Sequence, residues 1–219
     1  MQAAISPARS APDARALTLL ELLVVIAILA LLAWMLLPAI TRREARSPII
    51  ECAYHLKRIG IALRQFAADH RDRFPMEIST NQGGSLEWGG QASRHFLAIT
   101  NDLATPRVLL CPTDKERTSA RDWLSFGNQN LSYFISLDAD RHEPQMILAS
   151  DRIVSLGALP ARRGLMTLTT NRLVGFFPAI HRHRTIVLLA DGSVIICTPA
   201  QVRDQLQKAE NPRNRVAIP

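Results

Sequence analysis

The sequence predicts an α+β protein in which one long N-terminal helix packs on a small antiparallel β-sheet head. Two observations support this fold class. An apolar run near the N-terminus is followed by a segment with helical periodicity, and short β-rich runs dominate the second half. The chain has 219 residues, which leaves enough sequence after the apolar run for one domain with a hydrophobic core.

Residues 17–40 form an apolar run that is long enough to cross a bilayer. A membrane helix needs roughly 20 apolar residues, and no charged residue occurs from Leu22 to Ile40. An ordinary secretory signal has a shorter apolar core followed by a small-residue cleavage site, and no such site follows this run. We therefore expect residues 17–40 to stay on the protein as a transmembrane anchor.

Glu21 is the one charged residue in this run. A carboxylate at the centre of a bilayer costs about 2.5–3.5 kcal/mol, so an intramembrane acid usually has a partner. In one interpretation Glu21 lies near the headgroups and stays hydrated. In the other it pairs with a cation, and a free α-amine made by cleavage just before Leu17 would supply that cation.

The segment Arg-Ala-Leu-Thr-Leu-Leu-Glu-Leu-Leu-Val-Val-Ile-Ala-Ile resembles the class III signal of type IV prepilins and type II secretion pseudopilins. The resemblance implies that a prepilin peptidase cuts between Ala16 and Leu17 and N-methylates Leu17. It implies that Glu21 pairs with the amino terminus of a neighbouring subunit during filament assembly, and that Pro38 kinks the anchor helix. The chain departs from the family at the cut, where Gly and Phe are usual.

The resemblance also implies a topology and a set of partners. Residues 1–16 become a cytoplasmic leader peptide, and the chain crosses the bacterial inner membrane once with its head in the periplasm or in an extracytoplasmic filament. The partners are prepilin peptidase, an inner-membrane assembly platform and other pilin or pseudopilin subunits. Counting basic residues alone favours the opposite orientation, because three arginines follow the run at Arg42, Arg43 and Arg46. We follow the resemblance.

The segment 41–73 is predicted to be the amphipathic half of the same long helix. Its apolar residues recur at intervals of four and three, which places them on one helical face. We expect this helix to end near His70, before Phe74-Pro75. The residues of this stripe are Cys52, Leu56, Ile59, Leu63 and Phe66.

Residues 74–209 are predicted to form a globular β-rich head. A short helix is expected within 91–104, and strands within 107–112, 131–137 and 145–150. The clearest hairpin joins the β-rich runs 185–190 and 193–198 through Asp191-Gly192, and both turn residues are expected to need positive φ. Thr198-Pro199 starts a last helix that ends near Ala209, and residues 210–219 are predicted to be a disordered tail.

A second resemblance lies near the C-terminus. His181, followed after nine residues by Asp191 and Gly192, resembles the H-x9-DG element of a large group of prepilin-like proteins. Residues 110–114 resemble the Cys-Pro-Ser-Asp segment of that group, and His55 stands where the group usually has Asn. His181 could bind a metal with His183 or act as a base, but no hydrolase motif accompanies it. We therefore expect it to hydrogen-bond near the strand that enters the turn.

The cysteine count is three, which in an oxidising compartment allows one bridge and one free thiol. The preferred pair is Cys52 with Cys111, because Cys197 has the pattern of a buried strand residue. No Cys-x-x-Cys spacing occurs, so a structural zinc site is not expected. No cofactor is expected either, although some pseudopilins bind calcium in a C-terminal loop, and three acids near turns are candidates for such a site: Asp138, Asp140 and Asp151.

The net charge of +7 and the pI of about 10.1 raise the question of nucleic acid binding. The basic residues are scattered and aromatic residues make up only 5% of the chain, so no platform for stacking bases is apparent. A solvated basic surface is the favoured interpretation.

The leading functional hypothesis is a structural filament subunit, a pseudopilin or minor pilin, with no enzymatic activity of its own. A competing class is a single-span, membrane-anchored periplasmic enzyme or binding module, which would keep its activity in a soluble fragment and be indifferent to Glu21. A third alternative is an uncleaved anchor protein of a secretion apparatus, because Ala16 replaces the usual glycine.

Overall fold

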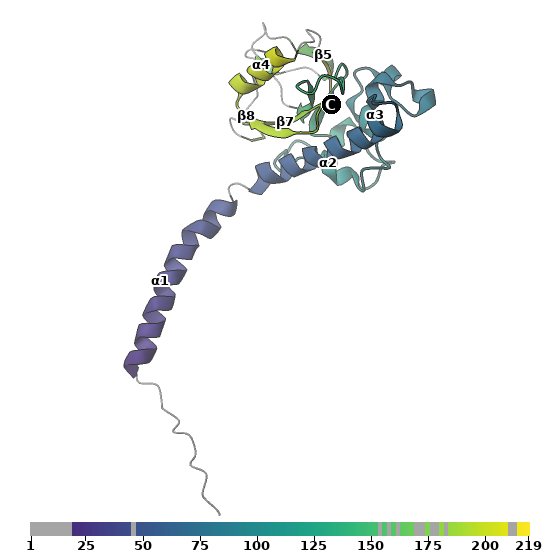
Figure 1. Ribbon diagram of the computed structural model, residues 1–219. Helices are drawn as coiled ribbons and strands as arrows, with labels where there is room; N and C mark the ends of the chain where they lie inside the picture. Colours follow the sequence, from purple (N-terminus) through teal and green to yellow (C-terminus); the bar gives the residue numbers. More distant parts are fainter. Residues whose placement is uncertain are drawn as a thin grey trace, which may run out of the picture. The chain divides into compact units, whose positions relative to one another are not determined.

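The chain divides into two compact units, Met1–Ala45 and Arg46–Pro219, in a computed structural model (Figure 1). The structure describes residues 19–44, 47–152, 155–156, 159–160, 163–168, 174–175, 180–181, 184–209 and 214–219. Each unit is described separately. Together they confirm the predicted α+β class, with an N-terminal helix and an antiparallel sheet.

The first unit contains helix α1, Leu19–Glu44, which includes Pro38. Its described side chains, from Leu19 to Trp34, are all exposed. The large apolar ones among them range from 49% exposure at Val24 to 81% at Leu19 and Trp34. Within the part of the chain that the structure describes, no helix combines the length and the hydropathy needed to cross a membrane, and the predicted span at 17–40 is therefore not shown.

Helix α2, Ser47–Asp69, belongs to the second unit. Every residue of the predicted apolar stripe is buried, from Cys52 and Leu56 at 0% exposure to Phe66 at 6%. Gly60 marks a close approach of α2 to the sheet, because a Cβ atom there would lie 2.6 Å from Leu188 Cδ1. The predicted continuous helix is thus described as α1 and α2, and residues 45–46 between them lie outside the described residues.

The head is built on a six-stranded antiparallel sheet with the order β5-β9-β1-β2-β7-β8. A smaller three-stranded sheet has the order β4-β3-β6. The strands of the large sheet are β1 Tyr133–Ser136, β2 Ile147–Asp151, β5 Gly164–Leu168, β7 Thr185–Leu189, β8 Val194–Cys197 and β9 Asn214–Ile218, and those of the small sheet are β3 Ser155–Leu156, β4 Leu159–Pro160 and β6 Val174–Gly175.

The large sheet is covered on both faces. On one face, Ile186 and Leu188 of β7 share a core cluster with the stripe of α2. On the other face, Val187 of β7 packs in a second cluster with Val202 and Leu206 of helix α4, Pro199–Lys208. Figure 1 shows α2 and α4 on opposite sides of the strand pair β7–β8. Because both faces are covered, β1, β2 and β7 are buried at every residue.

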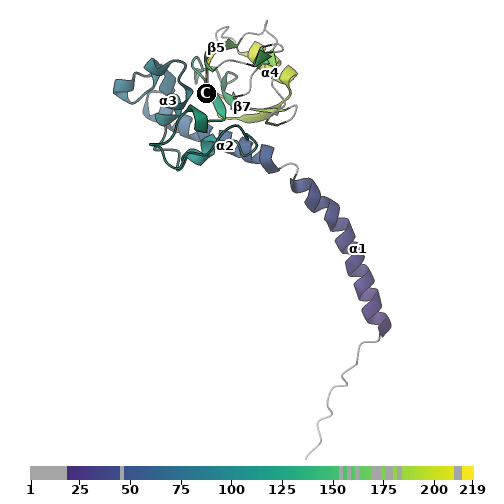
Figure 2. The same cartoon turned by 180° about the vertical axis from the view of Figure 1, so that it is seen from behind.

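The segment between α2 and β1 consists of short helices and turns. Helix α3, Ala92–Leu97 (Figure 2), is shorter than the predicted segment 91–104. Its Phe96 joins the core cluster of α2. The predicted strand at 107–112 is wrong, because Pro106–Leu109 form the 3-10 helix η4, which Thr105 caps by accepting from Arg107 N. The other 3-10 helices here are η1 Pro75–Glu77, η2 Thr80–Gln82, η3 Leu86–Trp88 and η5 Asn128–Asn130.

The β7–β8 hairpin and the helix after it are confirmed. Within the hairpin turn, Gly192 N donates to Leu189 O at 2.9 Å. Gly192 has a φ of +83°, but Asp191 is not among the described residues with positive φ, so the expectation of two such residues is wrong. One glycine suffices because the loop is longer than two residues. Thr198 caps α4, as predicted, and the structure adds that Gln201 completes a capping box with it.

The predicted disordered tail is wrong for residues 214–218. These residues form β9, which pairs with β5 on one side and with β1 on the other. Val216 and Ile218 point into the cluster of α4, and Ala217 into that of α2. The strand was missed because only three apolar residues follow the polar segment Asn-Pro-Arg-Asn-Arg. The preceding residues 210–213 lie outside the described residues.

The position of β9 inside the sheet leads to a stability prediction. Ile218→Ala should lower the free energy of unfolding by about 2–5 kcal/mol, because Ile218 is only 3% exposed. Ile196→Ala on β8, which is 41% exposed, is the control and should cost about 1 kcal/mol or less. Urea denaturation of the two variants measures the difference, and an unchanged stability of Ile218→Ala would show that the tail does not form part of the sheet.

Candidate functional site

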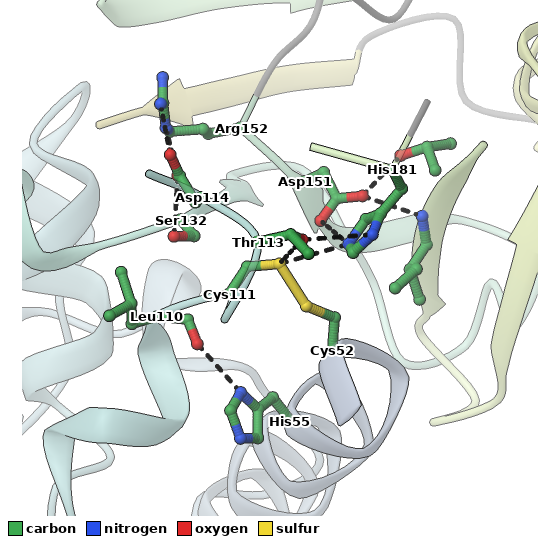
Figure 3. Close-up of a disulfide and its surroundings, with 12 residues drawn as sticks. Cys52, His55, Leu110, Cys111, Thr113, Asp114, Ser132, Asp151, Arg152 and His181 are labelled. Carbon is green, nitrogen blue, oxygen red and sulfur yellow. Dashed lines mark hydrogen bonds and ion pairs between the residues drawn. A yellow bond between two sulfur atoms is a disulfide. The ribbon is translucent and has the colours of Figure 1, made fainter. Parts of the chain in front are cut away.

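Three cysteine and histidine side chains from distant parts of the chain meet beside α2. Cys52 on α2 forms a disulfide with Cys111, with their Cα atoms 5.4 Å apart, and closes a loop across 59 residues. His181 lies against this disulfide, as Figure 3 shows. We call Cys52, Cys111, His181 and the neighbouring Asp151 the disulfide junction. The other cysteine, Cys197, is free and buried.

The imidazole of His181 is held on both sides. Its Nε2 lies 3.3 Å from Cys111 Sγ and its Nδ1 lies 3.4 Å from Thr113 Oγ1. The side chain is only 3% exposed, and this burial lowers the pKa of His181 to about 4. The ring is therefore neutral at pH 7, with one nitrogen available as a donor and the other as an acceptor.

Asp151, the last residue of β2, faces His181 across the junction. Its Oδ2 accepts from Ile186 N at 3.1 Å and from Thr185 Oγ1 at 3.2 Å. Its Oδ1 lies 4.0 Å from His181 Nε2 and has no hydrogen bond within the described residues. Burial raises the pKa of Asp151 to about 7, although the two hydrogen bonds act in the opposite direction. A carboxylate oxygen without a donor is uncommon in a protein interior.

Side chains of helix α2 also donate hydrogen bonds to two of the sequence motifs. His55 Nδ1 donates to Leu110 O at 3.0 Å, next to Cys111. Lys57 Nζ donates to Gly192 O at 2.7 Å, and Arg64 donates to Asp191 O at 2.6 Å. The resembling segments around Cys111 and at Asp191-Gly192 are therefore both held by α2. Burial lowers the pKa of His55.

A buried ion pair lies next to the junction in sequence. Asp114 accepts two hydrogen bonds from Arg152, at 2.8 and 2.9 Å, and one from Ser132 Oγ at 2.9 Å. The exposed fractions of the two charged side chains are 1% for Asp114 and 11% for Arg152. Burial raises the pKa of Asp114, but the hydrogen bonds and the positive charge of Arg152 outweigh it and hold the pKa below its ordinary value.

The remaining residues predicted for a site are distributed as follows. His181 faces the disulfide and not the turn at Asp191, and His183, Ala16 and Leu17 lie outside the described residues. Of the calcium candidates, Asp138 pairs with Arg215, Asp140 with His142, and Asp151 with the junction. No group of three carboxylates is found within the described residues.

Sequence reasoning missed Thr113, Ser132 and Arg152. The resemblance at residues 110–114 pointed to the first of them, because Thr113 stands at the Ser of the Cys-Pro-Ser-Asp segment. Nothing in the sequence pairs Arg152 with Asp114, since 38 residues separate them. Ser132 directly precedes β1 and Arg152 directly follows β2, so the antiparallel pairing of Tyr133 with Asp151 brings Arg152 next to Ser132, which in turn contacts Asp114.

Residues 12–37 match the family model described as the prokaryotic N-terminal methylation motif. The chain carries a prepilin-type cleavage and methylation signal. This signal indicates a type IV pilin-like precursor that prepilin peptidase processes, and it suggests a structural subunit and not an enzyme. Neither the curated proteins nor the solved structures contain a match to the chain. The H-x9-DG element is not part of the family match.

The buried ion pair gives the first prediction from this site. Asp114→Asn should lower the free energy of unfolding by about 1.5–3 kcal/mol, because Arg152 loses the charge-assisted hydrogen bonds to its buried partner and keeps only the exposed Glu116. Asp72→Asn is the matched control, since Asp72 pairs with Arg141 at 2.9 Å but is 58% exposed, and it should cost less than about 1 kcal/mol. Denaturation in urea measures both values, and equal losses would contradict the role of Asp114.

The second prediction concerns the pH dependence of the disulfide form. Asp151 ionises near 3.8 when unfolded and near 7 when folded, so its contribution to stability is full at low pH and falls as pH rises through 7. His181 ionises near 6.5 when unfolded and near 4 when folded, so its contribution is full at neutral pH and is lost as pH falls toward 4. Between about pH 4 and pH 6.5, rising pH therefore lowers the contribution of Asp151 to stability and raises that of His181.

Single substitutions should therefore expose each contribution. Asp151→Asn should make the stability rise more steeply between pH 4 and pH 6.5 than it does in the parent protein. His181→Gln should make the stability fall between pH 4 and pH 7. Urea denaturation across this pH range measures the slopes, and parallel curves for all three proteins would refute the assignment.

Proposed function

We propose that this chain is a structural filament subunit, a pseudopilin or minor pilin of a type II secretion or type IV pilus-like system. The observation that carries the proposal is the prepilin-type signal at residues 12–37, which runs into helix α1. The head supplies no catalytic motif in its sequence, and a filament subunit needs none.

The exposed surface of α1 supports this proposal. Its described side chains are exposed, and most of them are apolar. A helix that is apolar on all sides needs an apolar environment, and an exposed apolar surface of this size marks a site of interaction. Lipid provides that environment before assembly, and the α1 helices of other subunits provide it in the filament.

The proposed processing creates the charge that assembly uses. Prepilin peptidase cuts between Ala16 and Leu17 and methylates the new terminus at Leu17. The positive amine of one subunit then lies near Glu21 of its neighbour, and pairing compensates part of the cost of placing both charges in an apolar environment. Pro38 would kink the helix further along.

The proposal places the protein in the bacterial inner membrane before assembly, with its N-terminus in the cytoplasm and its head in the periplasm. Its partners would be prepilin peptidase, the assembly platform and other pilin-like subunits. The Cys52–Cys111 disulfide supports an oxidising location for the head.

The proposal predicts that Glu21→Val allows membrane association but strongly reduces filament yield, because the substitution removes the acid that meets the neighbouring amine. Glu51→Val is the matched control, since Glu51 is an exposed acid on α2 of the head. Shear fractions from a host that assembles the wild-type filament would be quantified by immunoblotting, with membrane fractions measured in parallel. Wild-type yield from Glu21→Val would contradict the proposal and would favour a single-span enzyme or binding module.

A further inference from the structure

We propose that the disulfide junction is a zinc site whenever Cys52 and Cys111 are thiols. The chain leaves the ribosome with both cysteines reduced, so this state precedes the disulfide and needs no reductant. The inference concerns the head and is independent of filament assembly. It assigns to the reduced head a ligand, Zn²⁺, that holds α2, the Cys111 segment and His181 together before oxidation.

The ligand atoms are already gathered in one place. The sulfur atoms of Cys52 and Cys111 and a ring nitrogen of His181 lie within 4.8 Å of one another, and all three residues are buried. Among the described residues, this is the one group of three metal-ligating side chains. Tetrahedral Zn²⁺ with Zn–S near 2.3 Å and Zn–N near 2.0 Å separates its ligand atoms by about 3.5–3.8 Å. The 3.3 Å between Cys111 Sγ and His181 Nε2 is close to that separation.

Asp151 supplies the fourth ligand. Its Oδ1 is buried, lacks a hydrogen bond and faces His181 Nε2 at 4.0 Å. The side chain is 5% exposed, and an unsatisfied buried acceptor of this kind costs free energy. A cation at the junction would satisfy this oxygen. Oδ2 is meanwhile fixed by Ile186 N and Thr185 Oγ1, and ligating carboxylates in proteins are usually hydrogen-bonded in this way.

The surroundings of His181 also fit a metal ligand. A histidine that binds zinc through one nitrogen usually donates a hydrogen bond from the other. Here Nδ1 faces Thr113 Oγ1 at 3.4 Å while Nε2 faces the sulfur. Two thiolates, one imidazole and one carboxylate select zinc, because soft sulfur ligands and tetrahedral geometry disfavour calcium and magnesium.

Zinc binding involves no change of oxidation state, so it needs no redox partner. Zn²⁺ binds the two thiols as thiolates, and two protons pass to solvent. When the head meets a protein disulfide oxidant, the two thiolates give up two electrons, the Cys52–Cys111 bond forms, and Zn²⁺ leaves. The disulfide of the oxidant takes up those two electrons and two protons and becomes two thiols. Zinc and the disulfide therefore exclude each other.

The test uses the full chain in mild detergent. A phosphine and water reduce the disulfide to two thiols and give the phosphine oxide, and the phosphine is then removed without oxygen. After incubation with ZnCl₂ and desalting, elemental analysis should find about one zinc per reduced chain and none on the disulfide form, as expected for a closed four-ligand site. Co²⁺ in place of zinc should show the visible absorption of a tetrahedral site with thiolate ligands. No zinc on the reduced chain would overturn the proposal.

Variants distinguish this site from adventitious binding. His181→Ala and Asp151→Asn should each weaken zinc binding at least about 10-fold, and Thr113→Val by about 10–100-fold. Cys197→Ala is the matched control and should bind as the parent does, since Cys197 packs in the cluster on the opposite face of the sheet. Unchanged binding in His181→Ala would overturn the assignment.

Two control measurements test whether each protein is folded. The disulfide form of each variant should show a cooperative thermal transition, so that loss of zinc is not loss of the head. If the reduced parent unfolds without metal, addition of ZnCl₂ should restore its circular dichroism spectrum, because metal binding then supplies folding free energy. Failure of zinc to restore it would count against the site.

Discussion

The head depends on the burial of one face of helix α2 against the sheet. Leu56, Ile59 and Leu63 are completely buried there, and the absence of a side chain at Gly60 lets the helix approach Leu188 of β7 closely. Once this face is packed, the contacts of α2 with the Cys111 segment and with the β7–β8 turn are determined as well. Cys52 reaches Cys111, His55 reaches Leu110 O, and two basic side chains reach the β7–β8 turn.

This packing explains why helices α1 and α2 differ so much in exposure. In α2 the apolar residues recur with helical spacing and are covered by the head itself. In α1 apolar side chains surround the helix and are exposed. A pilin-like precursor has to provide both kinds of surface, and the prepilin-type signal stands at the start of the exposed one.

The sequence alone predicted those elements that a local pattern of residues determines. The 3–4 spacing of Cys52 to Phe66 predicted the buried face of α2, Asp191-Gly192 predicted the hairpin, and Thr198-Pro199 predicted the start of α4. It failed where distant residues decide the structure. Residues 214–218 look like a polar tail, but they form β9 between β5 and β1. The error at Pro106–Leu109 has a local cause instead, because Thr105 caps a 3-10 helix there. The junction of His181 with Asp151 joins segments that no spacing relates, so its chemistry could not be read from the sequence.

Intact-mass spectrometry of protein extracted from the membranes of a host with prepilin peptidase would show whether the proposed processing occurs. We expect a chain that begins at Leu17 and carries one additional methyl group. The same protein from a host without the peptidase should keep residues 1–16 and lack the methyl group. A chain that keeps residues 1–16 in both hosts, or one that is cut at another position, would exclude cleavage between Ala16 and Leu17.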